Sequence, residues 1–302
     1  MGDTETRMRE QLATLKLVAV TEQYAALACE AAQKQWSHLD YLARLIDGEA
    51  QRRHQLAIER RIVSARLPCI KTLDQFDWNW PKKINRTQVQ NLFRLAFLKD
   101  KTNIIFLGGV GLGKTHLASA LAHEACLRGH SVLFTTAVDI INTLTAAQIV
   151  GRLKHELKRY LKPTILAVDE LGYLPIDKTG ADLLFQVISQ RYEQGSIVLT
   201  TNQPYKHWPK VFNNDSTLTS AVLDRLLHHA ETVVIEGKSY RKPSVALYWH
   251  RDPQTTRSSL PHSKTTATAG TLMAMEAHPL PHPATGKAST SAPPVPETCW
   301  TT

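Results

Sequence analysis

The chain has 302 residues, of which 43% are hydrophobic and 21% are charged, and its formal net charge is +9. Enough apolar side chains are present for a core, which excludes a wholly disordered or collagen-like protein. The four cysteines lie far apart without a CxxC pair, so a disulfide scaffold, a zinc ribbon or a redox motif has no support. The positive charge favours a polyanionic partner such as nucleic acid. The sequence shows no secretory signal and no apolar run of spanning length, so we expect a cytoplasmic protein with no membrane partner.

Residues 1–68 are expected to form a small all-α N-terminal domain. Apolar side chains recur there at approximately helical spacing, first at Leu12, Leu15, Tyr24 and Leu27 and then at Leu39, Leu42, Leu45 and Ile46. Ser37 can cap the second of these helices, because its hydroxyl accepts from backbone N–H groups that lack a helical partner. Pro68 stops that helix, since proline cannot continue the hydrogen-bond ladder.

Residues 69–102 are predicted to be a linker with a short helix around Thr87–Leu98, and residues 103–250 an α/β domain. Five strand-like segments alternate there with helical patterns, namely Asn103–Leu107, Ser131–Thr135, Thr164–Val168, Ser196–Thr201 and Thr232–Ile235. This alternation predicts a five-stranded parallel sheet covered on both faces. Residues 251–302 carry eight of the fifteen prolines among Thr, Ser, Ala and His, which predicts a disordered tail.

The most specific motif lies between the first strand and a helix predicted at His116–Leu127. It fits the phosphate-loop pattern GxxxxGK[ST], and the residues expected to bind ATP are Gly108, Gly109, Val110, Gly111, Leu112, Gly113, Lys114, Thr115 and His116. Glycines let successive backbone N–H groups point at phosphate oxygens, and the helix adds its positive N-terminal end. Lys114 would reach the β- and γ-phosphates, and the Thr115 hydroxyl would bind Mg²⁺.

Two carboxylates, Asp169 and Glu170, follow the apolar strand Thr164–Val168. Asp169 would hold Mg²⁺, and Glu170 would orient and activate the attacking water. Two adjacent acids about 50 residues after a phosphate loop indicate hydrolysis rather than nucleotide holding alone. The sequence therefore predicts an ATP hydrolase with ATP and Mg²⁺ as its ligands.

From about Leu12 to Arg241 the chain resembles the IstB-like ATPases, helper proteins of one class of bacterial insertion sequences. The resemblance is carried by Gly113–Ala118, Val168–Pro175, Leu223–His229 and Gly237–Arg241. Of these, the string Asp-Glu-Leu-Gly-Tyr-Leu-Pro is far more specific than a bare acidic pair, and Lys71–Asp77 is similar to the segment that leads into the family's ATPase domain. The chain departs from the pattern at Gly109-Val110, where the family usually has prolines, and beyond about residue 250.

This resemblance implies an AAA+ P-loop NTPase domain of the initiator clade, related to DnaA and DnaC. It further implies ATP-dependent assembly into a homo-oligomer on duplex DNA, deformation of that DNA, and work with a cognate transposase, with ATP hydrolysis regulating target choice. The N-terminal helices would support assembly and DNA contact. A DnaC-like helicase loader that binds single-stranded DNA stays an alternative, although the Leu-Gly-Tyr-Leu-Pro and Leu-Leu-His-His strings favour the transposition helper. A degenerate ATP-binding scaffold is disfavoured by the intact Asp169, Glu170 and Asn202.

The AAA+ likeness also assigns roles to three polar residues. Asn202, after the strand Ser196–Thr201, would contact the γ-phosphate and the attacking water as sensor 1, although an ordinary turn before Pro204 is the alternative. Arg225 would reach the γ-phosphate of a neighbouring subunit, and Arg241 would serve as sensor 2. Surface salt bridges are the alternative for both arginines. Arg191 is a lesser candidate for a subunit interface.

Two basic sets are candidates for DNA contact, because Lys and Arg neutralise phosphates. The first comprises Arg52, Arg53, Arg60 and Arg61, and the second comprises Arg152, Lys154, Lys158, Arg159 and Lys162. The second set lies where initiator-clade proteins line a nucleic-acid channel, while solvated helix faces are the alternative for both. Neither set shows a base-reading signature, so we expect little sequence preference. The pairs His228-His229 and His278/His282 lack partners at metal-ligand spacing.

Overall fold

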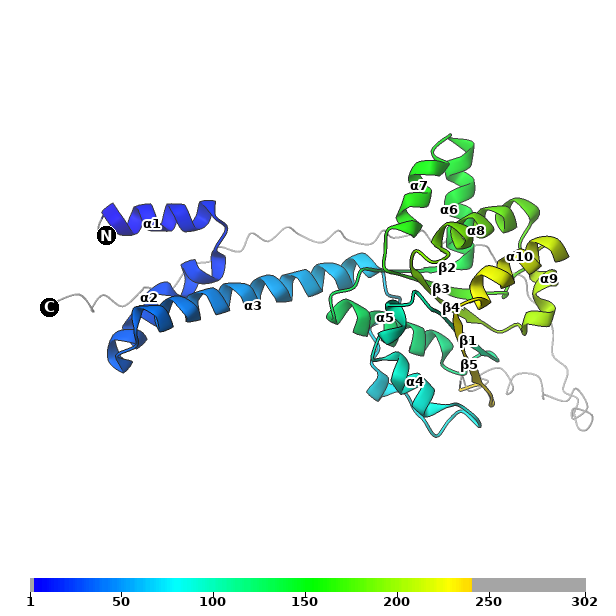
Figure 1. Ribbon diagram of the computed structural model, residues 1–302, viewed down its shortest axis with the longest axis horizontal. Helices are drawn as coiled ribbons and strands as arrows, with labels where there is room; N and C mark the ends of the chain where they lie inside the picture. The colour runs from blue at the N-terminus through cyan, green and yellow to red at the C-terminus, as the bar shows by residue number, and fades with distance from the viewer. Residues whose placement is uncertain (1–2, 241–302) are drawn as a thin grey trace, which may run out of the picture. The chain divides into compact units, whose positions relative to one another are not determined.

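Five parallel strands form the centre of the structure, a computed structural model that describes residues 3–240 (Figure 1). Across the sheet the strands run in the order β2-β3-β4-β1-β5. Their bounds are β1 Asn103–Gly108, β2 Val132–Thr136, β3 Ile165–Leu171, β4 Ser196–Thr201 and β5 Ala230–Ile235. The predicted sheet is confirmed, and each predicted strand overlaps an observed one. The predicted tail, residues 251–302, and Arg241 lie outside the described residues.

Side chains that alternate along the strands build a core on each face of the sheet. Ile104 and Phe106 belong to one core, which also receives helices α4 (Arg86–Leu92) and α5 (Lys114–Leu127). Ile105 belongs to the other core, which is covered by helices α6 (Ala137–Ile149), α7 (Leu153–Leu161), α8 (Lys178–Arg191), α9 (Trp208–Val211) and α10 (Ser216–Leu227). Figure 1 shows α6, α7, α8 and α10 on one side of the sheet and α5 on the other.

Residues 3–65 contain three helices, α1 (Asp3–Thr14), α2 (Val18–Lys34) and α3 (His38–Ala65). Ser37 caps α3 as expected: its hydroxyl accepts from the backbone N–H of Asp40, and the Asp40 carboxylate accepts from the backbone N–H of Ser37. Helix α3 ends at Ala65, three residues before Pro68, and Arg66 adopts the left-handed conformation. The division into a helical domain, a linker and an ATPase domain stays a prediction.

One expectation for local structure needs correction. Leu39, Leu42 and Ile46 lie on α3, as their helical spacing indicates, and they are 74%, 51% and 56% exposed, because no described element packs over that side of the helix. The helix expected at Thr87–Leu98 is broken into α4 and a 3₁₀ turn, η2 (Ala96–Leu98), because Leu95 adopts the left-handed conformation. Two further 3₁₀ turns are η1 (Leu73–Gln75) and η3 (Tyr205–His207). Within residues 3–240, no helix combines the length and the apolarity that crossing a bilayer requires.

Arg191, the last residue of α8, is a core residue rather than an interface residue. Its side chain is 1% exposed, and its guanidinium donates to five backbone carbonyls, those of Tyr160, Leu161, Pro163, Thr164 and Ser196. These carbonyls precede or begin strands β3 and β4. The expectation that Arg191 contacts another subunit is therefore wrong, because the fold encloses the group completely. Burial lowers the pKa of the guanidinium to about 10, so it stays charged at neutral pH.

Candidate nucleotide-binding and catalytic site

The phosphate loop joins β1 to α5 and depends on two glycines with left-handed backbone. Gly111 has φ +74° and Gly113, the N-cap of α5, has φ +84°. A Cβ at Gly113 would lie 2.7 Å from Cε2 of Phe76, and a Cβ at Gly111 would collide with Oγ of Ser239. Both positions thus need glycine for backbone conformation and for space. The loop presents the first backbone N–H groups of α5, which have no helical acceptor, toward one cavity.

Lys114 lies inside this loop and is only 4% exposed. Its Nζ donates to the carbonyl oxygen of Gly109 at 2.7 Å and lies 3.5 Å from the hydroxyl of Tyr173. The ammonium is also 5.9 Å from the centre of the Tyr173 ring. The cation is therefore held at the loop by the backbone and by an aromatic side chain from the segment after β3.

The two acids at the end of β3 have different surroundings, and the strand is irregular there. The pairing of β3 with β4 shifts register between Val168 and Leu171, and Glu170 has φ +62°. Asp169 is buried, and its Oδ1 accepts a hydrogen bond from the Thr115 hydroxyl at 3.1 Å and another from the Thr200 hydroxyl. Glu170 is exposed and lines the same cavity as the phosphate loop. One carboxylate is thus fixed beside Thr115, and the other faces the cavity.

Asn202 follows β4, the strand between β3 and β1, so it lies at the same edge of the sheet as the phosphate loop and the acids. Its Oδ1 is buried and has no hydrogen-bond partner within residues 3–240. Buried polar atoms usually have a partner, so an unpaired one at this edge fits a residue that contacts a ligand or water. Thr200, which bonds to Asp169 and to the backbone N–H of Glu170, was not predicted.

Aromatic side chains close the other side of the cavity, which has a volume of about 410 Å³. Phe76 packs edge-on against His116, with ring centres 5.5 Å apart. The Trp80 indole donates to the carbonyl of Lys238 at 2.9 Å, and its ring lies 4.9 Å from that of Tyr240. The backbone N–H of Tyr240 donates to the carbonyl of Gly111. Segments before β1 and after β5 are thus joined to the phosphate loop.

The sequence patterns did not predict that these aromatic residues belong to the site. Phe76, Trp78 and Trp80 stand out in the linker, and Tyr240 precedes the predicted sensor arginine. The fold brings the two segments together beside the loop, through the pairing of Lys83 with Glu236 and the contacts of Trp80. Tyr173, within the family string after the acids, also lines the cavity.

Arg225 does not line this cavity. It lies in the last turn of α10, with its guanidinium carbon 5.0 Å from the centre of the Phe185 ring and Nη1 donating to the carbonyl of Ala221. A contact with a γ-phosphate therefore needs the cavity of a second copy, and this role stays a prediction. The role of Arg241 lies outside the described residues.

The basic sets differ in how freely their side chains face solvent. Arg52, Arg53 and Arg60 line a hollow of about 560 Å³ together with Lys16, while Arg53 also pairs with Glu49 at 2.9 Å. Arg61 is half-buried near Gly129. On and beside α7, the exposed members of the second set are Arg152, Lys154, Lys158 and Lys162. Arg159 is half-buried and pairs with Glu156 at 3.0 Å.

Comparison with known proteins identifies the family of this chain. Residues 10–246 match the family described as IstB-like ATP binding protein. The chain belongs to the IstB-like ATP-binding proteins. It is 39% identical over 235 residues to an ATP-binding protein of insertion sequence IS5376 from Geobacillus stearothermophilus, covering 78% of this chain and 93% of that protein. It is 40% identical over 230 residues to an ATP-binding protein of insertion sequence IS21 from Pseudomonas aeruginosa, covering 76% and 86%.

A solved structure of AMPPCP-bound DnaA from Aquifex aeolicus is also similar, with a TM-score of 0.47 and 22% identity over 57% of this chain and 51% of that chain. The fold expected from the family resemblance, an AAA+ P-loop NTPase with five parallel strands, is confirmed. This IstB-like chain is an ATP-binding protein and an ATPase, related to proteins of insertion sequences.

Proposed function

We propose that this IstB-like protein is a DNA-binding ATPase that multimerises on duplex DNA with ATP and assists a partner transposase in insertion-sequence transposition. The observation that carries the hydrolytic part is the pairing of the Asp169 carboxylate with the Thr115 hydroxyl, with Glu170 facing the same cavity. The transposition part is supported by relatives that are named as insertion-sequence ATP-binding proteins. In this proposal the protein selects or remodels target DNA, and the partner supplies the strand-transfer chemistry.

The cavity suits ATP because its two sides differ in chemistry. The backbone N–H groups of the loop and the Lys114 ammonium provide positive charge for the phosphates. Phe76, Trp80 and Tyr240 provide flat apolar surface against which a purine base can stack. A volume of about 410 Å³ is in the usual range for small-molecule sites.

The donor set also fits Mg²⁺, which prefers hard oxygen ligands and keeps several waters. Thr115 and Asp169 supply a hydroxyl and a carboxylate oxygen only 3.1 Å apart, so both can hold one small cation. The metal, when bound, neutralises negative charge on the phosphates. The Thr200 hydroxyl holds Asp169 in place through its own hydrogen bond.

In the hydrolytic step, Glu170 accepts a proton from water and aligns it for attack on the γ-phosphate. Asn202 holds that water or a γ-phosphate oxygen through its side-chain amide. Arg225 of a neighbouring copy adds positive charge to the γ-phosphate in the transition state, which couples hydrolysis to assembly. Glu170 and Asn202 thus act from the carboxyl-terminal edge of the sheet, and Arg225 reaches the same edge from a neighbouring copy.

The exposed cations on and beside α7 and those around the α3 hollow would bind the DNA backbone. The proposal is tested by size analysis of the full chain with long duplex DNA or single-stranded DNA, each with and without ATP and Mg²⁺. We expect a large complex on duplex DNA that forms only with ATP. A preference for single strands, or no assembly unless a helicase hexamer is added, would contradict the proposal and favour a helicase loader.

A further inference from the structure

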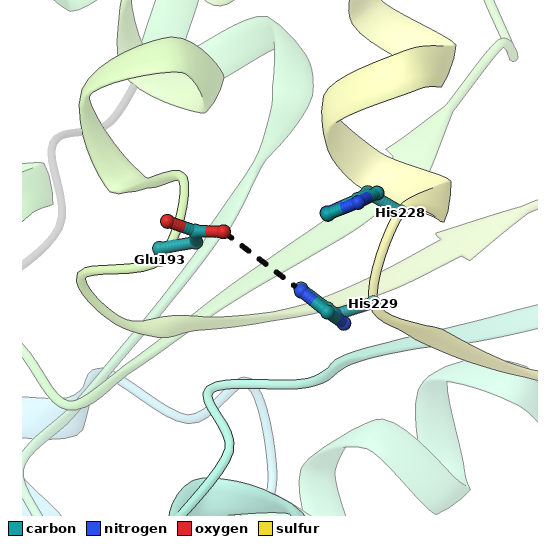
Figure 2. A group of neighbouring side chains, drawn as sticks. All are labelled: Glu193, His228 and His229. Carbon is teal, nitrogen blue, oxygen red and sulfur yellow. Dashed lines mark ion pairs between the residues drawn. The ribbon is translucent and has the colours of Figure 1, made fainter.

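Two turns meet at the edge of the sheet opposite the nucleotide cavity. One joins α8 to β4 and contains Glu193, and the other joins α10 to β5 and contains His228 and His229. Because β4 and β5 both run parallel to β1 as its two neighbours, their amino-terminal ends lie at the same edge of the sheet, on either side of the start of β1. The phosphate loop follows the carboxyl end of β1, so this cluster is separate from the ATP site. Figure 2 shows the three side chains converging from the two turns.

The three side chains have metal-ligand geometry and chemistry. One ligand atom from each of Glu193, His228 and His229 lies within 4.8 Å of the others. Nε2 of His229 is 3.8 Å from Oε1 of Glu193, and the centres of the two imidazole rings are 4.2 Å apart. The expectation that His228 and His229 lack a partner at metal spacing is wrong, because the fold brings Glu193 to them from a distant part of the sequence.

We propose that Glu193, His228 and His229 bind one divalent transition-metal cation of the zinc type. Two imidazoles and one carboxylate are a ligand set that such cations favour, whereas Mg²⁺ and Ca²⁺ favour oxygen ligands alone. Bonds of about 2.1 Å place tetrahedral ligand atoms roughly 3.4 Å apart, so small side-chain rotations complete the site. All three residues are exposed, which leaves these rotations unhindered and lets water complete the coordination.

A fourth residue supports this assignment. The hydroxyl of Tyr192 lies 2.7 Å from Nδ1 of His228. Histidines that bind metals usually hydrogen-bond through the other ring nitrogen, which fixes the orientation of the ring. Tyr192 adjoins Glu193, so one turn supplies both a ligand and the group that orients a ligand from the other turn. An isolated surface ion pair between Glu193 and His229 would involve neither His228 nor Tyr192.

The bound cation joins the C-terminal ends of α8 and α10. Helix α10 carries Arg225, and the guanidinium of Arg225 lies over Phe185 of α8. The metal thus stabilises the packing of the helix pair that presents this arginine. Metal binding itself does not depend on ATP hydrolysis or on DNA.

The test uses the full chain, stripped with a chelator, and titrates Zn²⁺ in competition with a chromophoric chelator. Other histidines and the exposed Cys29 and Cys69 can also bind zinc, so the site is measured as a difference between variants. We expect Glu193→Gln and His229→Gln each to bind one zinc fewer than the unmodified chain, and His54→Gln, an exposed control on α3, to bind the same number. Tyr192→Phe should keep the stoichiometry with roughly tenfold weaker binding.

A second measurement follows thermal unfolding of the same proteins with and without Zn²⁺. Zinc should raise the melting temperature of the unmodified chain and of His54→Gln, because a ligand that binds the folded state stabilises it. The rise should be smaller in His229→Gln and Glu193→Gln, which keep only the other zinc-binding groups. Equal zinc stoichiometry and equal melting shifts in all four proteins would overturn the proposal. The substituted side chains are exposed, so the variants are expected to fold.

Discussion

The buried guanidinium of Arg191 leads to a quantitative prediction about stability. Its five hydrogen bonds reach carbonyls before and at the start of β3 and β4, which ties together the amino-terminal ends of two central strands. The variant Arg191→Met keeps a long unbranched side chain but removes every donor. The carbonyls it leaves behind stay buried, because the surrounding core is unchanged.

The magnitude follows from two opposing effects. A hydrogen bond from a charged donor contributes about 1.5–3 kcal/mol. The five carbonyls share the four hydrogens of Nη1 and Nη2, so we count four such bonds. Burial opposes this, since a pKa lowered from 12.5 to about 10 corresponds to a desolvation penalty of about 3 kcal/mol. Taking the lower value for each of the four bonds, the free energy of unfolding should fall by about 3 kcal/mol in Arg191→Met. This is a large share of the roughly 5–15 kcal/mol that stabilises a typical domain.

The assay is urea unfolding at neutral pH, followed by circular dichroism. The matched control is Arg128→Met. Arg128 follows α5, and its exposed side chain pairs with Glu124 and donates to the carbonyl of Arg94, so its loss should change stability by less than about 1 kcal/mol. Below the unfolding transition, Arg191→Met should bind ATP with unchanged affinity, because Arg191 lies at the edge of the sheet opposite the phosphate loop. A loss of less than about 1 kcal/mol in Arg191→Met would refute this account of the interior.

The remaining predictions concern the ATP and DNA sites. Glu170→Gln should bind ATP but hydrolyse it about 10²–10⁴-fold more slowly, since the base that takes the proton from water is lost, and unchanged turnover would remove Glu170 from the mechanism. Arg225→Ala should be inactive by itself, and mixing it with Lys114→Ala should restore part of the hydrolysis, because one subunit then supplies the loop and the other the arginine. No restored activity would argue against a role in trans. In the double variant of Lys154→Ala and Lys158→Ala, the negative slope of log affinity for duplex DNA against log salt should become shallower by about 2. An unchanged slope would mean that these side chains contact no phosphates.

The sequence by itself determined the parts of the protein that depend on local residue order. The strand, glycine turn and helix that carry the phosphate-loop motif could be predicted, because all three patterns lie within about 25 residues of sequence. The five strands were also predictable, since short apolar runs bounded by polar residues suit a sheet that is covered on both faces. The Ser37 cap could be predicted for the same reason, because it depends on residues three positions apart.

Only the tertiary structure decided which distant residues meet and which side chains are enclosed. Trp80 reaches the carbonyl of Lys238 across 158 residues, and the aromatic wall of the cavity depends on that contact. Glu193 meets His229 because two strands of the parallel sheet flank β1 in register, not because of any spacing along the chain. Arginine usually lies at the protein surface, but the packing of α8 against strands β3 and β4 makes Arg191 a buried cation. Local patterns encode backbone conformation, whereas burial and long-range contacts follow from how the strands are ordered across the sheet.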